Sequence, residues 1–518
     1  MVDRRYPVST QTFSNVRERF DVYVDKTAHI YEIITKNSVV FLARPRRFGK
    51  SLLCSTIASV FQNKRELFKG LAIDKSDWVW QEHPVVHLDL ISGEQTDIIG
   101  LKNSINDQFD EICLDYDISV EQNNDISSRF RRIITTLSRK MNTVVVIIDE
   151  YDNPLLKTVD NPILHEEIRK TLQEFYGILK KVDEHLRFVF ITGITKFAQV
   201  SMFSDMNQPD DISTLSEYSD ICGISQAELE ENFKQELDEY SVEYGGRDKY
   251  IQKLKNTYDG YCFSQKKLSV YNPFGLIRHF NNKGDFSSFW TGSGTPTFMV
   301  KYIDKNYVDF VNIENVTMKK EDFANYRFDK IKLIPLLYQS GYLTITDYDK
   351  ESGLYTLNYP NTEVREYFAN FLAESYSNSQ KILDRSLLFE FMKTIVNGDV
   401  KEFMELLKIY LHRIDYSLSS KITEYYFEFA VSNIINMLGL VCEHEVHTAT
   451  GRIDSVILTP KRIYVFEFKV DKPIENAIKQ IKRKDYALFY ANDGREIIKI
   501  GVVFSREEKN IVNWKVKV

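Results

Sequence analysis

Two segments about a hundred residues apart constrain the fold of this 518-residue chain more than any other part of it. The first begins with the apolar run Val39–Leu42, passes through Arg44–Ser51 and leads into residues 52–58, whose apolar side chains have helical spacing. A strand, a loop and a helix in this order predict a phosphate-binding loop, because N–H groups of the loop and of the helix N-terminus can surround phosphate oxygens. Arg44 replaces the usual first glycine of G-x-x-x-x-G-K-[ST], so the turn must be made by other means.

This pattern assigns roles to individual residues of the loop. Lys50 is expected to reach the β- and γ-phosphates of a nucleotide, and the Ser51 hydroxyl is expected to ligate Mg²⁺. The residues expected to bind the nucleotide cofactor are Arg47, Phe48, Gly49, Lys50, Ser51 and Leu52.

The second segment, Val144–Glu150, consists of five β-branched residues followed by two carboxylates. Such a run is typical of a strand that is buried on both faces and ends at a site. We expect Asp149 to hold Mg²⁺ together with Ser51, and Glu150 to orient or deprotonate the attacking water. Taken alone, the first segment could be a basic turn before a helix, and the second could be a buried strand that ends in acids. The two segments in this order favour nucleotide binding.

A third apolar strand, Arg187–Thr195, ends in hydroxyl residues and is followed by Lys196. In phosphate-loop ATPases of the AAA type, a polar residue at the end of the neighbouring strand senses the γ-phosphate. Thr192 or Thr195 is expected to do this here. The alternative is that threonine is simply a good strand residue.

Changes of pattern divide the chain into four segments. Residues 1–225 alternate apolar strands with helical stretches, which predicts a mostly parallel sheet with helices on both faces. Residues 226–375 are expected to be helical and winged-helix-like, residues 376–412 a helical connector, and residues 413–518 a separate unit. The predicted strands of the first segment are Val39–Leu42, Val85–Leu90, Val144–Ile148 and Phe188–Thr192.

The winged-helix interpretation depends on an apolar helix at Ile331–Leu337 followed by two strand-like runs, Gly341–Ile345 and Leu354–Leu357. Such an element can contact DNA or can serve as a packing module for the ATPase. We favour the packing module.

Charge and cysteine content limit the classes of protein. The formal charge of −7 is no global nucleic-acid signature, but residues 451–518 carry 15 Lys and Arg against 9 Asp and Glu. This basic end is compatible with a nucleic-acid contact or with ordinary surface charge.

The cysteine pattern and the apolar runs exclude other classes. The absence of a C-x-x-C pair argues against a zinc site and against a disulfide framework. The absence of a long apolar run predicts a soluble, cytoplasmic protein with no membrane partner. The cysteines are Cys54, Cys113, Cys222, Cys262 and Cys442.

Three residues near the C-terminus suggest a second site. Asp454 opens one strand, and Glu467 and Lys469 lie two apart on the next, so those two side chains point to the same face. If the strands pair through a turn at residues 459–461, the three groups converge. Asp454 and Glu467 can then hold Mg²⁺ while Lys469 positions or activates water for phosphodiester hydrolysis. The alternative is a surface hairpin whose charges form solvated ion pairs.

Two helices flank this predicted hairpin. The upstream helix 424–438 carries Glu424 and Glu428 one turn apart, and either can complete the metal shell. The downstream helix is expected to contact nucleic-acid phosphates. Its residues of interest are Gln480, Lys482, Arg483, Lys484 and Tyr486.

As a set, these motifs resemble bacterial proteins that join an AAA-ATPase-like domain to a C-terminal domain of the PD-(D/E)xK nuclease superfamily. The resemblance covers nearly the whole chain. It includes the loop, because an arginine in place of the first glycine resembles the pattern of this family. Its carriers are Tyr23–Thr27, Arg44–Ser51, Ile148–Asp152, Ile191–Phe197, Leu337–Leu343, Gly451–Asp454 and Glu467–Lys469.

The resemblance implies an α/β fold: an AAA-type phosphate-loop domain, a helical and winged-helix-like middle region, and a C-terminal domain like that of restriction endonucleases. It implies that Asp454, Glu467 and Lys469 occupy the catalytic positions of a nuclease core and that Glu424 is the helix glutamate beside them. Gln480 resembles the superfamily's polar helix residue. Ile453 departs from the pattern, since proline commonly precedes the aspartate.

The expected function is an ATP-dependent or ATP-gated nuclease that uses Mg²⁺. The competing hypothesis is a nucleotide-switched binding protein whose nuclease-like domain grips nucleic acid or protein without cutting. Related architectures suggest defence against foreign DNA or maintenance of mobile elements, and AAA relatives suggest a homo-oligomer. ATP or GTP, and DNA or RNA, stay open from the residues, although DNA is the expected substrate.

Overall fold

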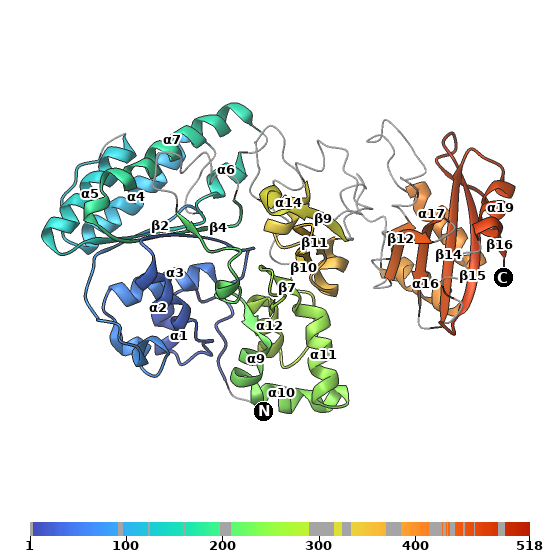
Figure 1. The fold of residues 1–518 in the computed structure, drawn as a ribbon, viewed down its shortest axis with the longest axis horizontal. Helices are drawn as coiled ribbons and strands as arrows, with labels where there is room; N and C mark the ends of the chain where they lie inside the picture. Colours follow the sequence, from blue (N-terminus) through green and yellow to red (C-terminus); the bar gives the residue numbers. More distant parts are fainter. Residues whose placement is uncertain are drawn as a thin grey trace. The chain divides into compact units, whose positions relative to one another are not determined.

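The computed structural model divides into two compact units, Met1–Lys301 with Val316–Asn361, and Tyr302–Asn315 with Thr362–Val518 (Figure 1). The four segments that the sequence predicts are finer than this division and remain a prediction. The structure describes residues 4–91, 97–122, 125–158, 161–196, 209–289, 315–323, 333–368, 385–413, 427, 431, 432, 434, 435, 441–448, 451–459, 461–484, 490 and 493–517.

The first unit is built on a parallel sheet, as the sequence predicts. Its five strands are ordered β2-β3-β4-β1-β5, and every neighbouring pair is parallel. All residues of β3 are buried, which explains its unbroken apolar sequence. The strands are β1 (Val39–Ala43), β2 (Val85–Asp89), β3 (Val144–Asp149), β4 (Leu186–Gly193) and β5 (Asp210–Asp211).

Helices cover both faces of this sheet (Figure 1). One face carries α1 (Phe13–Glu18), α2 (Thr27–Lys36) and α3 (Lys50–Phe61). The other carries α4 (Ile98–Asp115), α5 (Ile126–Lys140) and α7 (Pro162–Lys181), and α6 (Asn153–Lys157) directly follows the acidic end of β3. Side chains of Asp97, Asp125 and Asn161 cap α4, α5 and α7 by accepting hydrogen bonds from the first helical N–H groups.

The same unit continues into a helical region around a small antiparallel sheet, ordered β6-β8-β7. Its aromatic core includes Phe233 stacked on Phe280, with ring centroids 4.8 Å apart. The elements are β6 (Ile224–Ser225), α9 (Gln226–Asn232), α10 (Lys234–Tyr240), α11 (Arg247–Tyr258), β7 (Tyr261–Cys262), β8 (Ser269–Tyr271) and α12 (Pro273–Asn281).

The predicted helix and hairpin are present as α14 (Leu333–Gln339), β10 (Thr344–Asp349) and β11 (Leu354–Asn358), and β9 (Val316–Lys319) adds a third strand to β11. This element is attached to the rest of the unit. The Thr344 hydroxyl accepts a 2.6 Å hydrogen bond from the Cys262 N–H, and the Asn361 amide donates to the Asp259 carbonyl at 2.7 Å. These contacts favour the packing module over the DNA-binding interpretation.

The second unit contains a mixed sheet ordered β12-β13-β14-β15-β16, in which β14 and β15 are parallel and the other pairs antiparallel. Helix α19 (Ile474–Lys484) makes the crossover between the parallel strands. The strands are β12 (Val441–Thr448), β13 (Gly451–Leu458), β14 (Arg462–Val470), β15 (Glu496–Ser505) and β16 (Asn510–Lys517). The mixed α/β fold expected for this end of the chain is confirmed.

Helices α16 (Arg385–Asn397) and α17 (Val400–Arg413) occupy the segment for which the sequence predicts a connector. They pack on the C-terminal sheet, because Phe391 and Phe403 share one hydrophobic core with Phe466 and Phe468 of β14. The apolar stripe of these helices is therefore explained by burial against the C-terminal sheet. Among the helices that the structure describes, none has both the length and the apolar character needed to cross a membrane.

Candidate functional site

The loop between β1 and α3 makes its turn at two residues in the left-handed region. Arg47 has φ 66° and Gly49 has φ 88°, and α3 begins directly after Gly49. Nothing lies within 4 Å of the position that a Cβ of Gly49 would occupy. The turn that the first glycine of the pattern would make is therefore made further along the loop.

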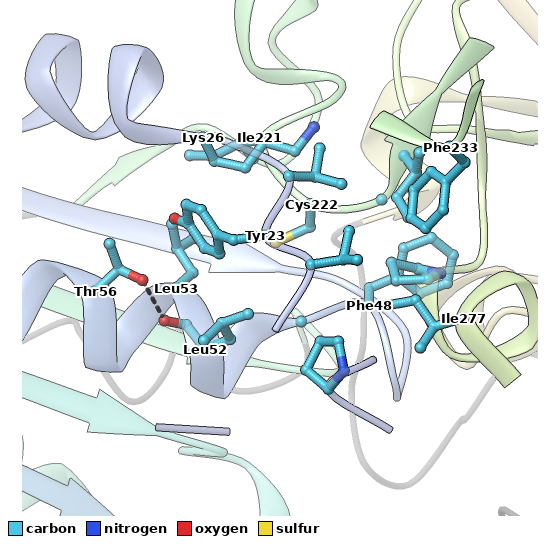
Figure 2. Close-up of a pocket in the computed structure, with 17 residues that line it drawn as sticks. Tyr23, Lys26, Phe48, Leu52, Leu53, Thr56, Ile221, Cys222, Phe233 and Ile277 are labelled. Carbon is cyan, nitrogen blue, oxygen red and sulfur yellow. Dashed lines mark hydrogen bonds between the residues drawn. The ribbon is translucent and has the colours of Figure 1, made fainter. Parts of the chain in front are cut away.

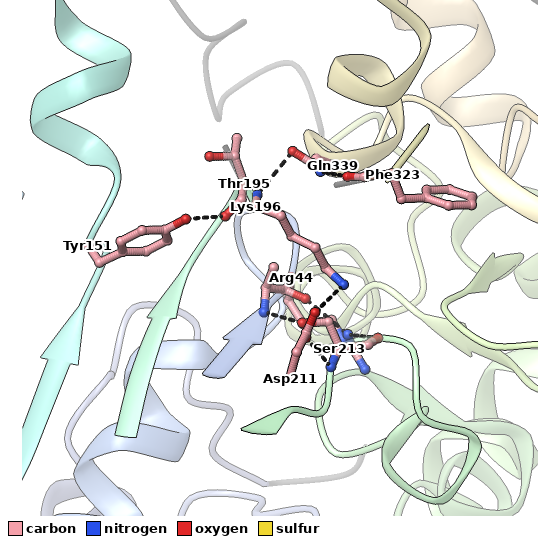
Figure 3. Close-up of polar contacts among 9 residues, drawn as sticks. Arg44, Tyr151, Thr195, Lys196, Asp211, Ser213, Phe323 and Gln339 are labelled. Carbon is pink, nitrogen blue, oxygen red and sulfur yellow. Dashed lines mark hydrogen bonds and ion pairs between the residues drawn. The ribbon is translucent and has the colours of Figure 1, made fainter. Parts of the chain in front are cut away.

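Arg44, at the position of that missing glycine, is buried and ties the loop to the chain beyond β5 (Figure 3). Its guanidinium donates to the Ser213 carbonyl at 2.7 Å and to the Tyr218 carbonyl at 3.0 Å. It also lies 4.2 Å from the ring centroid of Phe263. Burial lowers the pKa of Arg44. The sequence reveals only a lost glycine here, whereas the structure shows a cross-link between three segments.

Two other loop residues contact the helical region of the same unit. Phe48 is buried against Tyr261 and Phe263, at centroid distances of 4.8 and 5.4 Å. The Arg47 guanidinium lies 3.9 Å from the ring centroid of Phe274. These aromatic contacts stabilise the left-handed turn at Arg47, which is costly for a residue with a side chain.

Lys50 and Glu150 form a buried ion pair, with Lys50 Nζ 3.0 Å from Glu150 Oε1. Lys50 also donates to the Pro45 carbonyl at 3.2 Å. Burial lowers the pKa of Lys50, but the charges of Glu150 and Asp149 oppose it, and the net pKa is raised. The structure places these two residues, both expected at the nucleotide site, in direct contact, and the ammonium stays charged at the loop.

Asp149 ends β3 beside the loop. Its Oδ1 accepts the Glu150 N–H at 3.0 Å, and the nearby Ser51 hydroxyl and Lys50 ammonium favour its charged form. Burial and the neighbouring charge of Glu150 raise the pKa of Asp149 to about 6. Glu150 itself has φ 52°, a conformation that non-glycine residues adopt at an energetic cost and that is concentrated at functional sites. Ser51 at the start of α3 and Asp149 at the end of β3 are the pair of oxygen-bearing residues that phosphate-loop enzymes use to hold one Mg²⁺.

Asp152 is a third carboxylate at this edge, and sequence reasoning did not single it out. It is buried and accepts hydrogen bonds from the N–H groups of Ile194 at 3.2 Å and Thr195 at 2.7 Å, and from the Thr195 hydroxyl. Burial, followed by the charge of Glu150, raises the pKa of Asp152 to about 6. A Cβ on Gly193 would lie 2.4 Å from Asp152 Oδ1, so only glycine fits there. The available signal was the spacing Asp149-Glu150-Tyr151-Asp152.

The two threonines expected to sense the γ-phosphate are buried. The Thr192 hydroxyl donates to the Leu42 carbonyl at 2.8 Å, and the Thr195 hydroxyl donates to Asp152. The Thr192 hydroxyl therefore links β4 to β1, and the Thr195 hydroxyl links the chain after β4 to the start of α6. Sensing by either residue would require a change of hydrogen-bond partner, and it stays a prediction.

Lys196, just after β4, links the sheet to the helix-and-hairpin element (Figure 3). Its Nζ lies 2.7 Å from Asp211 Oδ2, and its N–H donates to Gln339 Oε1 at 3.2 Å. The Gln339 amide in turn donates to the Phe323 carbonyl at 2.7 Å. The end of β4 is thus connected by hydrogen bonds to α14, within one unit.

An apolar cavity lies next to the loop (Figure 2). The loop and α3 contribute one wall, the segment after α1 a second, and the chain around residue 222 and α12 the others. Phe48, Gly49 and Leu52, all predicted to bind the cofactor, line it. Its other lining residues are Pro7, Val22, Tyr23, Val24, Lys26, Leu53, Thr56, Ile221, Cys222, Gly223, Ile224, Phe233, Pro273 and Ile277. The cavity is therefore mostly apolar and adjoins the predicted phosphate-binding loop at Phe48 and Gly49.

The second candidate site lies on the hairpin of β13 and β14, where the predicted residues converge. Lys469 Nζ is 2.8 Å from Glu467 Oε1 and 3.8 Å from Asp454 Oδ2. Asp454 Oδ2 accepts the Phe468 N–H at 2.8 Å. The Glu467 side chain is 0% exposed and those of Asp454 and Lys469 about a tenth exposed. A surface hairpin with solvated ion pairs does not describe this buried cluster.

The cluster lies on the face of the sheet that α19 covers. Glu467 and Lys469 continue the alternation of Ile463 and Val465, which pack with Ile481 of α19. Of the residues predicted to meet nucleic acid, Gln480 is partly buried on α19 and Lys482 is exposed. The Arg483 side chain lies outside the described residues, as do Glu424, Glu428 and Tyr486.

Two different protein families match the two regions of the chain that contain the candidate sites. The family described as "Predicted AAA-ATPase" matches residues 7–203, and the "PD-(D/E)XK nuclease superfamily" matches residues 422–514. A protein of Azotobacter chroococcum mcd 1, named "Uncharacterized protein in vnfD 5'region", is 32% identical over 530 residues, which span 100% of this chain and 99% of that protein. The matched ranges contain the loop with its ion pair and the buried hairpin cluster.

Proposed function

This chain belongs to the family of AAA-ATPase-like proteins that carry a C-terminal domain of the PD-(D/E)XK nuclease superfamily, and on that premise we propose that it is an ATP-controlled, Mg²⁺-dependent nuclease. The observation that carries this proposal is the buried convergence of Asp454, Glu467 and Lys469. Three ionisable groups are held out of water on one sheet face, at a cost that a purely structural hairpin would avoid.

The nucleotide half of the proposal depends on the exchange of partners at Lys50. In this structure Glu150 holds the ammonium at 3.0 Å. Phosphate oxygens arriving at the loop would take over the ammonium, since they carry more charge and are also bound by the N–H groups of α3. Glu150 would then be released to orient water and accept its proton. Ser51 and Asp149 are the residues that would hold Mg²⁺, which neutralises charge on the transferred phosphoryl group.

The cavity supports ATP over GTP. Its lining is mostly apolar, and two of the polar side chains in it already have partners: the Thr56 hydroxyl donates to the Leu52 carbonyl at 2.7 Å, and Lys26 pairs with Glu228. The additional polar edge of guanine would lose its hydrogen bonds to water and gain few side-chain partners. Adenine has fewer such groups to satisfy.

In the nuclease half, Asp454 and Glu467 are the residues that would hold Mg²⁺, a hard cation that prefers carboxylate oxygens. Lys469 would position the attacking water and stabilise the charge that develops on the phosphate. Gln480 and Lys482 on α19 would bind the backbone of the nucleic acid, with DNA as the proposed substrate and foreign or mobile DNA as its source. Assembly into a homo-oligomer in the presence of ATP is part of the same proposal.

One observation favours the alternative, a nucleotide-switched protein that binds nucleic acid without cutting it. The Lys469 ammonium lies within 4 Å of both carboxylates and donates to the Phe468 carbonyl. A lysine that neutralises its two acidic neighbours in this way lowers their affinity for a cation. The two functions differ in whether Mg²⁺ displaces this lysine.

The deciding experiment is cleavage of plasmid, linear duplex, single-stranded DNA and RNA by the full-length protein, with Mg²⁺ or Mn²⁺ and with or without ATP. Lys469→Ala should abolish cutting and retain ATP binding. Lys472→Ala, at an exposed lysine three residues further on, is the matched control and should retain both. Cutting that persists in Lys469→Ala would refute the assigned site, and ATP turnover without cutting of any substrate would establish the binding protein instead.

A further inference from the structure

Three metal-ligating side chains of the first unit meet beside the nucleotide site, and the proposed function uses only one of them. Ligand atoms of Cys54, His87 and Asp149 all lie within 4.8 Å of one another. They come from α3, β2 and β3 respectively. Cys54 lies one turn after Lys50 on α3, and the parallel register of β2 and β3 pairs His87 with Ile147, so His87 and Asp149 share a sheet face.

Two of these groups have no other evident task in this part of the molecule. Cys54 is a fully buried free thiol. His87 Nε2 is buried, and among the residues that the structure describes none lies within hydrogen-bonding distance of it. Buried polar atoms without a partner are rare because they lose hydration without compensation, so each calls for an explanation such as an ion.

The chemistry of the set selects a particular class of cation. A thiolate, an imidazole and a carboxylate are together typical of Zn²⁺, which often has three protein ligands and a fourth, open position. Bonds of about 2.0–2.3 Å in a tetrahedral site place ligand atoms about 3.5 Å apart, so a small closure of the observed cluster would suffice. Mg²⁺ does not favour sulfur or imidazole ligands.

We propose that Cys54, His87 and Asp149 form a binding site for a thiophilic divalent cation of the Zn²⁺ type. The sequence argued against zinc because it lacks a C-x-x-C pair, but that pattern reports only ligands that are close in the chain. Here the ligands lie about thirty and sixty residues apart and meet through the sheet.

The site has a consequence that rests on the proposed function. Asp149 is also the residue that would hold the Mg²⁺ of the nucleotide, so one carboxylate cannot serve both cations fully. Zn²⁺ at this cluster would therefore inhibit ATP hydrolysis in competition with Mg²⁺. Cys54 and His87 would act as a metal-sensing extension of the nucleotide site.

The test uses the full-length protein stripped of metal by chelation and titrated with Co²⁺ alone, followed by displacement with Zn²⁺. Co²⁺ bound to a thiolate in a tetrahedral site gives a sulfur-to-metal absorption band and visible bands, and Zn²⁺ should remove both. Loss of a residue that merely supports a metal ligand lowers metal affinity about 10–100-fold, so His87→Asn, which removes a ligand, should weaken Co²⁺ binding by at least that factor. Cys54→Ser should abolish the sulfur band. Cys113→Ser, which replaces another buried cysteine, is the matched control and should leave the spectrum unchanged.

Two outcomes would overturn the proposal: a wild-type protein without the sulfur band, or a band that survives in Cys54→Ser. Thermal unfolding of each variant identifies any loss of folding, and His87→Asn serves as the second ligand variant if Cys54→Ser does not fold. In a separate arm, Zn²⁺ should inhibit ATP hydrolysis by wild type and not by His87→Asn. A protein that binds Co²⁺ but hydrolyses no ATP would refute the ATPase and leave the metal site intact.

Discussion

The ammonium of Lys50 lies 3.0 Å from Oε1 of Glu150, so the lysine expected to bind phosphate is paired with the glutamate expected to activate water. Both side chains are buried, and each supplies a counter-charge to the other. Under the proposed function, a nucleotide would have to break this pair before Glu150 could act as a base. The ion pair would then connect nucleotide binding to the release of Glu150.

Glu150→Gln is expected to separate binding from hydrolysis. The amide keeps the shape of the side chain but cannot accept a proton, so ATP hydrolysis should fall about 10²–10⁴-fold. ATP affinity should be unchanged or tighter, because no carboxylate competes for Lys50. Phosphate release and fluorescent-nucleotide binding measure the two effects, with Glu166→Gln at an exposed glutamate of α7 as the control. Loss of ATP binding in Glu150→Gln would contradict the exchange of partners.

Lys50→Ala should impair both nucleotide binding and stability. Removal of the ammonium leaves Glu150 buried without its counter-charge, and breaking such a pair costs about 3–5 kcal/mol. The double variant Lys50→Met with Glu150→Gln removes both charges and should recover most of the stability but none of the nucleotide affinity. The unfolding midpoint and a nucleotide titration distinguish the two losses. Unchanged ATP affinity in Lys50→Ala would rule out the phosphate-binding assignment.

Arg44→Gly restores the glycine of the usual loop pattern, yet we expect it to harm the protein. The variant loses hydrogen bonds to the Ser213 and Tyr218 carbonyls and the contact with Phe263, a loss of about 2–4 kcal/mol. Nucleotide affinity should not improve, because the turn is already made at Arg47 and Gly49. Chemical denaturation measures the loss, and Arg46→Ala, at the neighbouring and partly exposed arginine, is the control. A more stable Arg44→Gly variant would show that the cross-link is dispensable.

The pH dependence follows from Asp149, whose pKa is raised from 3.8 to about 6 by burial and by the charge of Glu150. The folded protein binds this proton more tightly than the unfolded chain. The stability that the proton contributes is fully present below pH about 4 and is lost as the pH rises through about 6. Mg²⁺ binding needs the ionised carboxylate, so stabilisation by Mg²⁺-ATP should show the opposite trend and vanish as the pH falls below about 6. Unfolding midpoints with and without Mg²⁺-ATP across this range check both signs, and equal stabilisation throughout would contradict the role of Asp149.

Ile277→Trp should test the cavity as the site of the base. The larger side chain, on α12 at the cavity wall, would fill space that the base needs and should weaken ATP binding at least about tenfold. Binding of inorganic phosphate or pyrophosphate at the loop should be little affected, because their contacts would lie at Gly49 and Lys50. Isothermal titration with each ligand makes the comparison. Equal ATP affinity in the variant and in wild type would place the base elsewhere.

The local order of residues determined the framework of both units. Runs of β-branched residues predicted β1 to β4 because an apolar run of that length must be buried between layers. The motif around Lys50 and the spacing of Glu467 and Lys469 predicted which side chains share a loop or a strand face, since both follow from backbone geometry alone. For that reason the parallel sheet of the first unit agrees with expectation, and Asp454, Glu467 and Lys469 lie close together.

Only the tertiary structure decided which side chains from distant parts of the sequence contact one another. Arg44 contacts carbonyls about 170 residues away, Asp152 accepts hydrogen bonds from the chain just after β4, and Cys54 of α3 lies near His87 of β2. Periodicity reports which face of an element is buried, but it does not report which distant group lies opposite. A long-range hydrogen bond or ion pair depends on the packing of whole elements, and that packing exists only once the chain has folded.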